Sequence, residues 1–159
     1  MYKLQKSFPR HDSNLFSIIW QLTIPPRMKI FIWQVTQEKI ATVDNLKKRG
    51  WMLVNRCSLC INSEETVEHI FNECSFFSQF LQKAMLHSTA FYSLSFTRNP
   101  EFIMDGTQMK SHRELMAVLC FILWRERCSR IFREVEQPFN LLVEQVFLKW
   151  RTLHPQHSS

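Results

Sequence analysis

The sequence predicts a mainly α-helical fold that is interrupted once by a small irregular segment rich in cysteine. Apolar residues make up 45% of the 159 residues, which is enough for one domain with a buried core. They recur at intervals of three and four along most of the chain, which is the period of an amphipathic helix. Glycine occurs only at Gly50 and Gly106, whereas strand-rich folds usually use more glycine in their turns.

The first half of the chain predicts three helices. The segments 13–22 and 27–40 each carry an apolar stripe at helical spacing, and the Pro25–Pro26 step separates them. Thr42 is placed to cap a short third helix, VDNLKKR. Gly50 is placed to end that helix in a left-handed conformation.

The second half predicts three more helices and one loop. Residues 75–86 have the pattern of an amphipathic helix, and residues 87–109 lack periodicity and predict a loop. The longest predicted helix is 110–136, and Pro138 fits the first turn of a last helix over 138–153. The buried stripe of the long helix is expected to contain Leu115, Val118, Leu119, Ile122, Cys128, Ile131 and Phe132.

Positive charge is concentrated before and after the cysteine-rich segment. Residues 1–56 carry ten Lys and Arg against three Asp and Glu, a balance of +7. Residues 57–105 carry two against six, and residues 106–159 carry eight against five. A basic first third favours a polyanionic partner, nucleic acid first, although a solvated basic surface gives the same composition.

Compartment signals favour an intracellular protein of the nucleus or cytoplasm. No apolar stretch approaches the ~20 residues needed to cross a bilayer, and no signal-peptide pattern is visible. Five cysteines are an odd number, which disfavours a secreted disulfide framework. The acid-free start MYKLQKSFPRH leaves a mitochondrial presequence as an alternative.

The cysteine-rich segment has the spacing Cys57-x2-Cys60-x8-His69-x4-Cys74. Zinc binds four such soft and borderline ligands as a tetrahedron. The stretch TVEHIFNEC predicts one or two helical turns, which bring His69 to the side of Cys74 if the chain turns just before that cysteine. Four protein ligands would leave no open position on the metal. The predicted cofactor is therefore one structural Zn2+, held by an irregular CCHC insertion in a small helical domain.

Three other interpretations of these residues stay open. A redox Cys-x-x-Cys pair would need a preceding strand, and residues 51–56 predict only a weak one. A disulfide is disfavoured by the expected compartment. Burial as ordinary core residues fits poorly with the polar run between Cys60 and His69. Cys120 and Cys128, eight residues apart in the long helix, are expected to pack in the core.

The motifs around this cluster resemble the reverse-transcriptase zinc-binding domain found at the C-terminal end of plant LINE-type retrotransposon polyproteins. The resemblance rests on FSIIWQLTIPPRMKIFIWQV, IATVDNLKKRGW, CSLCINSEETVEHIFNEC and FILWRERCSRIF. Its strong part covers residues 16–80, and a weaker helical part covers 110–153. The family has Arg-Asn after a downstream Trp, whereas this chain has Arg127-Cys128. The matched positions are Trp20, Pro25, Pro26, Lys29, Phe31, Trp33, Asp44, Asn45, Leu46, Arg49, Gly50, Cys57, Cys60, Glu65, His69, Phe71 and Cys74.

The resemblance implies a non-catalytic role beside a reverse transcriptase. The polymerase step needs paired aspartates, and the three aspartates of this chain, Asp12, Asp44 and Asp105, form no such pair in sequence. We therefore expect no enzyme activity. We also expect one helical domain over 13–153 with tails at 1–12 and 154–159. Because Met1 lies close to the start of the match, we expect a free-standing product, either a retroelement fragment or a domain adopted by the host.

Two functions of different classes follow. In the first, basic side chains track the phosphates of single-stranded or structured RNA or DNA while tryptophans stack on unpaired bases. Core packing is the alternative for Trp33 and the expectation for Trp20. In the second, the domain binds a host protein or a second copy of itself, which would cover the apolar stretch 120–124 of the long helix. The candidate nucleic-acid contacts are Arg27, Lys29, Lys39, Lys47, Lys48, Arg49, Arg56, Trp33 and Trp51.

Overall fold

The computed structural model of the protein describes residues 13–86 and 110–155. The predicted tail 1–12, the predicted loop 87–109 and residues 156–159 of the predicted C-terminal tail lie outside these described residues.

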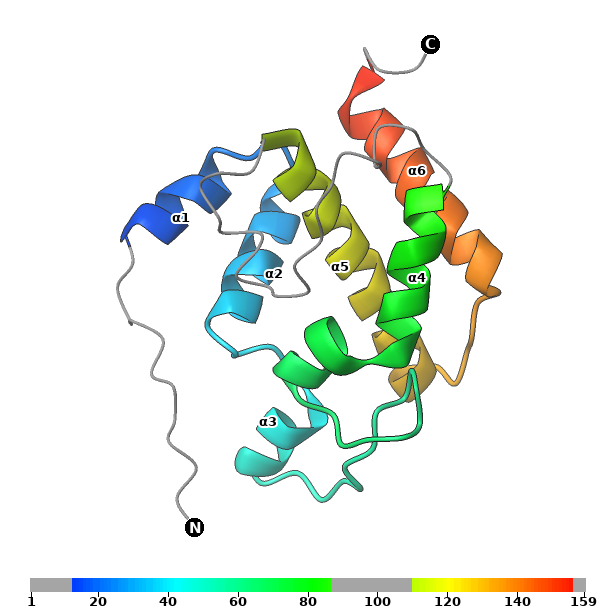
Figure 1. The fold of residues 1–159 in the computed structure, drawn as a ribbon. Helices are drawn as coiled ribbons and strands as arrows, with labels where there is room; N and C mark the ends of the chain where they lie inside the picture. The colour runs from blue at the N-terminus through cyan, green and yellow to red at the C-terminus, as the bar shows by residue number, and fades with distance from the viewer. Residues whose placement is uncertain (1–12, 87–109, 156–159) are drawn as a thin grey trace.

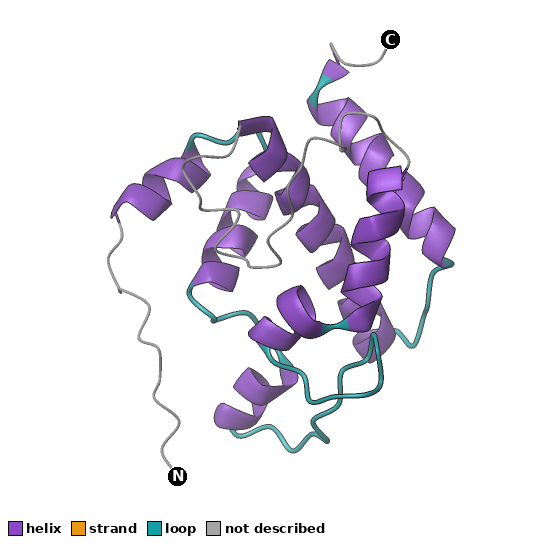
Figure 2. Cartoon of the chain, viewed as in Figure 1, coloured by secondary structure: helices purple, strands orange, loops and turns teal. Residues whose placement is uncertain are grey.

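Helices and loops account for all of the described residues, with no strand among them (Figure 2). This confirms the mainly α-helical class. The elements in chain order are α1 (Ser13–Trp20), α2 (Pro26–Thr36), α3 (Val43–Lys48), the π-helical turn η1 (His69–Glu73), α4 (Ser75–Leu86), α5 (Lys110–Phe132) and α6 (Phe139–Leu153).

Two predicted helices end earlier than expected because a non-glycine residue adopts a left-handed conformation. Glu38 has φ 54°, and Lys39 N–H donates to Gln34 O at 2.9 Å, which is the hydrogen bond of a Schellman cap at the end of α2. Glu134 has φ 53° just after α5, so this helix ends at Phe132 and not at residue 136. Gly50 takes φ 93° after α3, as expected for that glycine.

Helix α5 lies at the centre of the fold, between α2 on one side and α6 on the other (Figure 1). Helix α4 packs against α6 and against η1. Phe31 of α2 contacts both α5 and η1, since its ring centroid lies 5.6 Å from that of Phe121 and 6.4 Å from that of Phe71. The core is therefore built around the long helix, with the cysteine-rich loop and α3 at one end.

This arrangement corrects three expectations. The apolar stretch 120–124 of α5 is covered by the chain itself, so it gives no reason to expect a partner. Phe132, expected in the buried stripe, is exposed because it is the last residue of α5. Trp20, expected in the core, is 41% exposed and stacks on Phe16, with ring centroids 4.3 Å apart.

Among the described residues, no helix is long and apolar enough to cross a membrane.

A buried carboxylate ties the α1–α2 loop, the start of α5 and the end of α6 together. Glu114 accepts from Thr23 N–H at 2.6 Å, and its other oxygen lies 2.5 Å from His154 Nε2. Lys110 adds a hydrogen bond of 2.9 Å to the Thr23 hydroxyl. The Glu114 side chain is only 3% exposed, so it depends on these partners in place of water.

We expect Glu114→Ala to lower the free energy of unfolding by about 2–3 kcal/mol, because it removes the carboxylate that accepts from Thr23 N–H and contacts His154 Nε2. Chemical denaturation measures this loss. The control is Glu144→Ala, which removes an exposed carboxylate from α6. Equal stability of the two variants would show that the Glu114 network contributes nothing.

Candidate metal centre

A tight turn presents the first two cysteines. Cys57 N–H donates to Ser63 O at 2.8 Å, and Ile61 N–H donates to Cys57 O at 3.0 Å. Arg56 Nε reaches across to Ile61 O at 2.9 Å. These bonds close the loop on itself and place Cys57 and Cys60 on one side of it.

The other two candidate ligands lie at the two ends of η1, since His69 is its first residue and Cys74 follows its last. Thr66 caps the helical turn that leads into η1, because its hydroxyl accepts from His69 N–H at 2.9 Å. Cys74 N–H then donates to His69 O at 2.7 Å, an i to i+5 bond. In an α-helix, residues five apart point ~140° away from each other, whereas π-helical winding brings them closer to one face. The π turn therefore explains how His69 and Cys74 face the same point.

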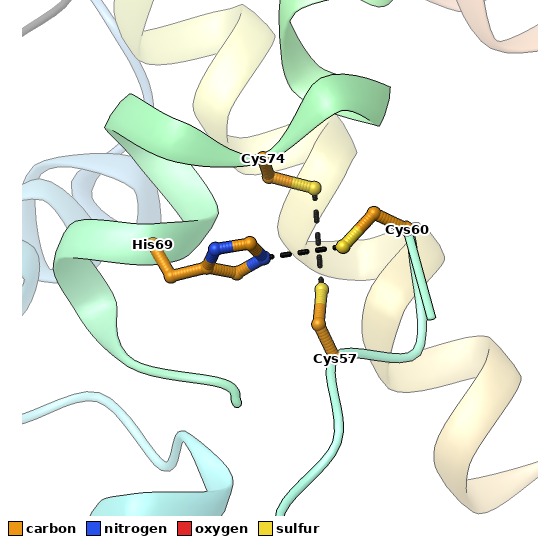
Figure 3. Close-up of side chains that lie close together, drawn as sticks. All are labelled: Cys57, Cys60, His69 and Cys74. Carbon is orange, nitrogen blue, oxygen red and sulfur yellow. Dashed lines mark hydrogen bonds between the residues drawn. The ribbon is translucent and has the colours of Figure 1, made fainter. Parts of the chain in front are cut away.

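The four side chains converge on a common centre (Figure 3). Their ligand atoms all lie within 4.8 Å of one another. Cys57 Sγ lies 4.0 Å from Cys74 Sγ, and Cys60 Sγ lies 3.3 Å from His69 Nε2. A tetrahedron with Zn–S bonds of ~2.3 Å has sulfur–sulfur edges of about 3.8 Å. The donor set and its spacing therefore fit a zinc ion, and these four residues could hold one.

The two buried cysteines of the cluster, Cys57 and Cys74, share a hydrogen bond that shifts both of their pKa values. A hydrogen bond with Cys74 and burial raise the pKa of the Cys57 thiol well above its usual range. The same hydrogen bond lowers the pKa of Cys74. Zinc binds cysteine as the thiolate, so binding of the ion would release the thiol protons of this pair. His69 Nδ1 lies 3.8 Å from a Glu73 carboxylate oxygen, on the ring edge opposite Cys60.

Two arginines of α5 hold the loop in place. Arg127 donates from Nε to Glu65 Oε2 at 3.1 Å and from Nη2 to Glu65 Oε1. Arg130 donates from Nη1 to the carbonyl of Ser58, between the first two cysteines, at 3.3 Å. Arg127 and Glu65 are both fully buried, and the Arg127 guanidinium lies 4.5 Å from the ring centroid of Trp124. The loop is thus anchored to the central helix by charge-assisted hydrogen bonds.

The same glutamate also caps α3. Glu65 Oε1 accepts from Val43 N–H at 2.8 Å, whereas the hydroxyl of Thr42 donates to Asp44. Thr42 occupies the expected cap position, but its side chain makes no capping bond there. Glu65 N–H in turn donates to Asn55 Oδ1 at 2.7 Å. One carboxylate therefore links α3, the cysteine-rich loop and α5.

Comparison with known proteins gives this geometry a context. A family model described as "zinc-binding in reverse transcriptase" matches residues 1–80, half of the chain. The chain belongs to this family. The matched family is a zinc-binding domain and not the catalytic part of a reverse transcriptase.

A relative from Arabidopsis thaliana carries the name "putative ribonuclease H protein". It is 24% identical over 130 residues, which cover 77% of this chain and 20% of the relative. The chain therefore spans about a fifth of the length of that protein. No solved structure matches the chain.

The residues predicted to contact nucleic acid fall into two groups. Six lie on α3 or in the loops beside it, and all six are exposed: Lys39, Lys47, Lys48, Arg49, Arg56 and Trp51. The other three, Arg27, Lys29 and Trp33, lie on α2, where Lys29 and Trp33 are half-buried. The edge of Trp33 meets Phe16, with ring centroids 5.4 Å apart, and Lys29 Nζ donates to Trp20 O at 2.9 Å. The first group therefore offers more free surface.

Sequence reasoning missed the structural role of Arg127 and Arg130. Charged residues on a helix predict a solvated face, and Glu65 lies 62 positions from Arg127 in sequence. A signal was nevertheless available, since Glu65 and Arg127 belong to the motifs that carry the family resemblance and have opposite charges. Cys120 is buried in the core as expected, and burial raises the pKa of its thiol to about 12.

We expect Arg127→Met to lower the free energy of unfolding by about 3–5 kcal/mol, because Glu65 would keep a buried charge without its partner. The double variant Glu65→Gln/Arg127→Met should lose less than the sum of the two single variants. Denaturant titration of all four proteins measures the coupling. Arg125→Met, on the exposed side of the same helix, is the matched control. Additive losses would mean that the two side chains do not interact.

Proposed function

We propose that Cys57, Cys60, His69 and Cys74 bind one zinc ion whose role is structural. The observation that carries this proposal is the convergence of three sulfurs and one imidazole nitrogen within 4.8 Å in a member of a zinc-binding family. Four protein ligands leave no coordination site for a substrate or a reactive water. The ion would connect the turn at Cys57 and Cys60 to η1 through bonds to side chains of both segments.

We expect about one zinc per chain in purified protein. Removing the ion should lower the Tm by about 10 °C. This value assumes that zinc binding stabilises the folded state by ~4 kcal/mol, and that each kcal/mol shifts the Tm by ~2–4 °C. Elemental analysis and thermal unfolding with and without chelator measure both quantities. Cys57→Ser and His69→Ala should lose the metal, whereas the control Cys128→Ser should keep it. Unfolding that is insensitive to the chelator would refute the ligand assignment.

We further propose that the domain binds nucleic acid through the basic surface around α3, without catalysing a reaction. The support is the group of exposed cations at Lys39, Lys47, Lys48, Arg49 and Arg56, next to the exposed ring of Trp51. The family name places related domains in reverse transcriptases, and the relative is named for ribonuclease H, so both belong to proteins that act on nucleic acid. Single strands and structured RNA are the proposed ligands, because a stacking ring needs unpaired bases. The proposed compartment is the nucleus or the cytoplasm.

A protein-interaction module is the second candidate from the sequence, with a host protein or a second copy as partner. Its main reason was the apolar stretch 120–124 of α5, and that stretch is buried by α2 and α6. Nucleic-acid binding is therefore the function that the surface supports better.

We expect the triple variant Lys47→Ala/Lys48→Ala/Arg49→Ala to bind single-stranded RNA about tenfold more weakly near physiological salt. It should also lower the slope of log affinity against log salt by about 2, since each lost phosphate contact removes ~0.7 on single strands. Fluorescence anisotropy over a salt series measures both effects. The control is Arg125→Ala/Arg133→Ala/Arg151→Ala, which removes three exposed charges from α5, the loop after it and α6. If both variants bind alike, only the net charge matters and the proposed surface is wrong.

A further inference from the structure

The loop after α3 exposes an unusual run of large apolar side chains. Trp51 is 58% exposed, Met52 97% and Val54 88%, and Leu53 between them is also exposed. Most connecting loops use polar residues, glycine or proline at such positions. Other exposed apolar residues on α6, such as Leu141 and Leu148, stand apart from one another on a helix.

This segment is fixed at both ends. Trp51 N–H donates to Leu46 O at 3.1 Å, and Asn55 Oδ1 accepts from Glu65 N–H at 2.7 Å. Arg56 then joins the segment to the cysteine turn through Ile61 O. The apolar side chains are therefore presented by a braced loop.

Ile61 adds a second unusual feature to this end of the molecule. It lies on the turn directly after Cys60, is 49% exposed and has φ 65°. A β-branched residue rarely adopts this left-handed conformation, which glycine adopts without strain. A strained residue that displays an apolar side chain to solvent at the edge of a candidate site points to a contact role.

Charge around these residues selects the kind of partner. Between Asp44 and Glu64 the chain has no acidic residue and four basic ones, Lys47, Lys48, Arg49 and Arg56. A partner that matches this surface must carry negative charge and also apolar faces. Unpaired nucleotides have both, since each phosphate comes with a base whose face can pack on an apolar or aromatic side chain. In a duplex the bases are stacked on one another, and these faces are not available.

We propose that the exposed apolar side chains of Trp51, Met52, Val54 and Ile61, here called the ridge, contact the unpaired bases of single-stranded nucleic acid, while the flanking cations hold its phosphates. This inference rests on the proposed function and adds the residues that would read single strands in preference to duplex. It assigns base contact to three aliphatic side chains beyond the tryptophan.

The test compares two ridge variants with the parent protein loaded with zinc. The first is Met52→Ser/Val54→Ser, and its matched control is Leu141→Ser/Leu148→Ser on α6. The probes are a labelled 20-nucleotide single-stranded RNA, the single-stranded DNA of the same sequence and the corresponding DNA duplex, each titrated over a salt series. Zinc content and thermal unfolding are measured for every variant.

The ridge variant should bind single strands about three- to tenfold more weakly, which is less than the loss of an aromatic ring stacked on a base produces. Its salt slope should equal that of the parent, because no phosphate contact is removed. Its affinity for duplex and the affinity of the α6 control should not change.

The second ridge variant, Ile61→Gly, distinguishes the loss of a base contact from the loss of folding stability. Glycine removes the strain at φ 65°, so this variant should unfold at the same or a higher temperature while it binds single strands more weakly. General destabilisation cannot produce that combination. Unchanged binding by both ridge variants would overturn the inference.

Two further outcomes are distinguishable. If the Lys47/Lys48/Arg49 variant loses affinity and the ridge variants do not, the proposed function stands and the ridge inference fails. If the parent binds none of the three nucleic acids, both fail. Vesicles of phosphatidylserine and phosphatidylcholine test the other anionic partner with apolar parts. Ridge-dependent vesicle binding without ridge-dependent nucleic-acid binding would overturn the inference in favour of a membrane surface.

Discussion

The buried pair between Glu65 and Arg127 fixes the cysteine-rich loop relative to the helices. A carboxylate without solvent is costly unless its oxygens are all used, and here they accept from Arg127 and from the backbone of Val43. The guanidinium of Arg127 has a second partner as well, since it lies over the ring of Trp124, 4.5 Å from the ring centroid. Neither charge can leave this position without leaving the other unpaired in the interior. The loop, α3 and α5 are therefore held in one arrangement.

This constraint connects the candidate metal centre to the basic surface. Glu65 caps the first turn of α3, and the last turn of α3 carries Lys47 and Lys48. The backbone N–H of Glu65 donates to the side chain of Asn55, which lies at the end of the exposed loop that follows α3. On the other side, Arg130 donates a hydrogen bond to the carbonyl of Ser58, between the first two cysteines. The proposed ligand-binding surface and the proposed zinc site thus share a scaffold, although no side chain belongs to both.

The helices were predictable where local pattern alone decides them, and less so where a distant contact does. Residues 75–86 match α4 because the apolar stripe lies within the segment. The early ends of α2 and α5 depend on Glu38 and Glu134 in left-handed conformations, which their residue type disfavours. The cysteine and histidine cluster was predictable from spacing, since zinc chemistry restricts which residues fit. The π turn that brings His69 and Cys74 together and the burial of Arg127 depend on tertiary contacts, which periodicity does not contain.

The physical unit that holds the candidate metal centre extends beyond the part of the chain that matches the family model. That match ends at residue 80, whereas Arg127 and Arg130 come from α5. Within residues 1–80 alone, the Glu65 carboxylate would keep only its bond to Val43, and the carbonyl of Ser58 would lose its donor. Phe31 would also lose its contacts with the aromatic side chains of Phe121 and Trp124 on α5. A zinc ion can join the cysteine turn to η1, but it cannot supply a counter-charge for Glu65, because the carboxylate faces α5 and α3 and is not among the four converging ligands. Placement of the loop therefore depends on the central helix, whose arginines a metal ion could not replace.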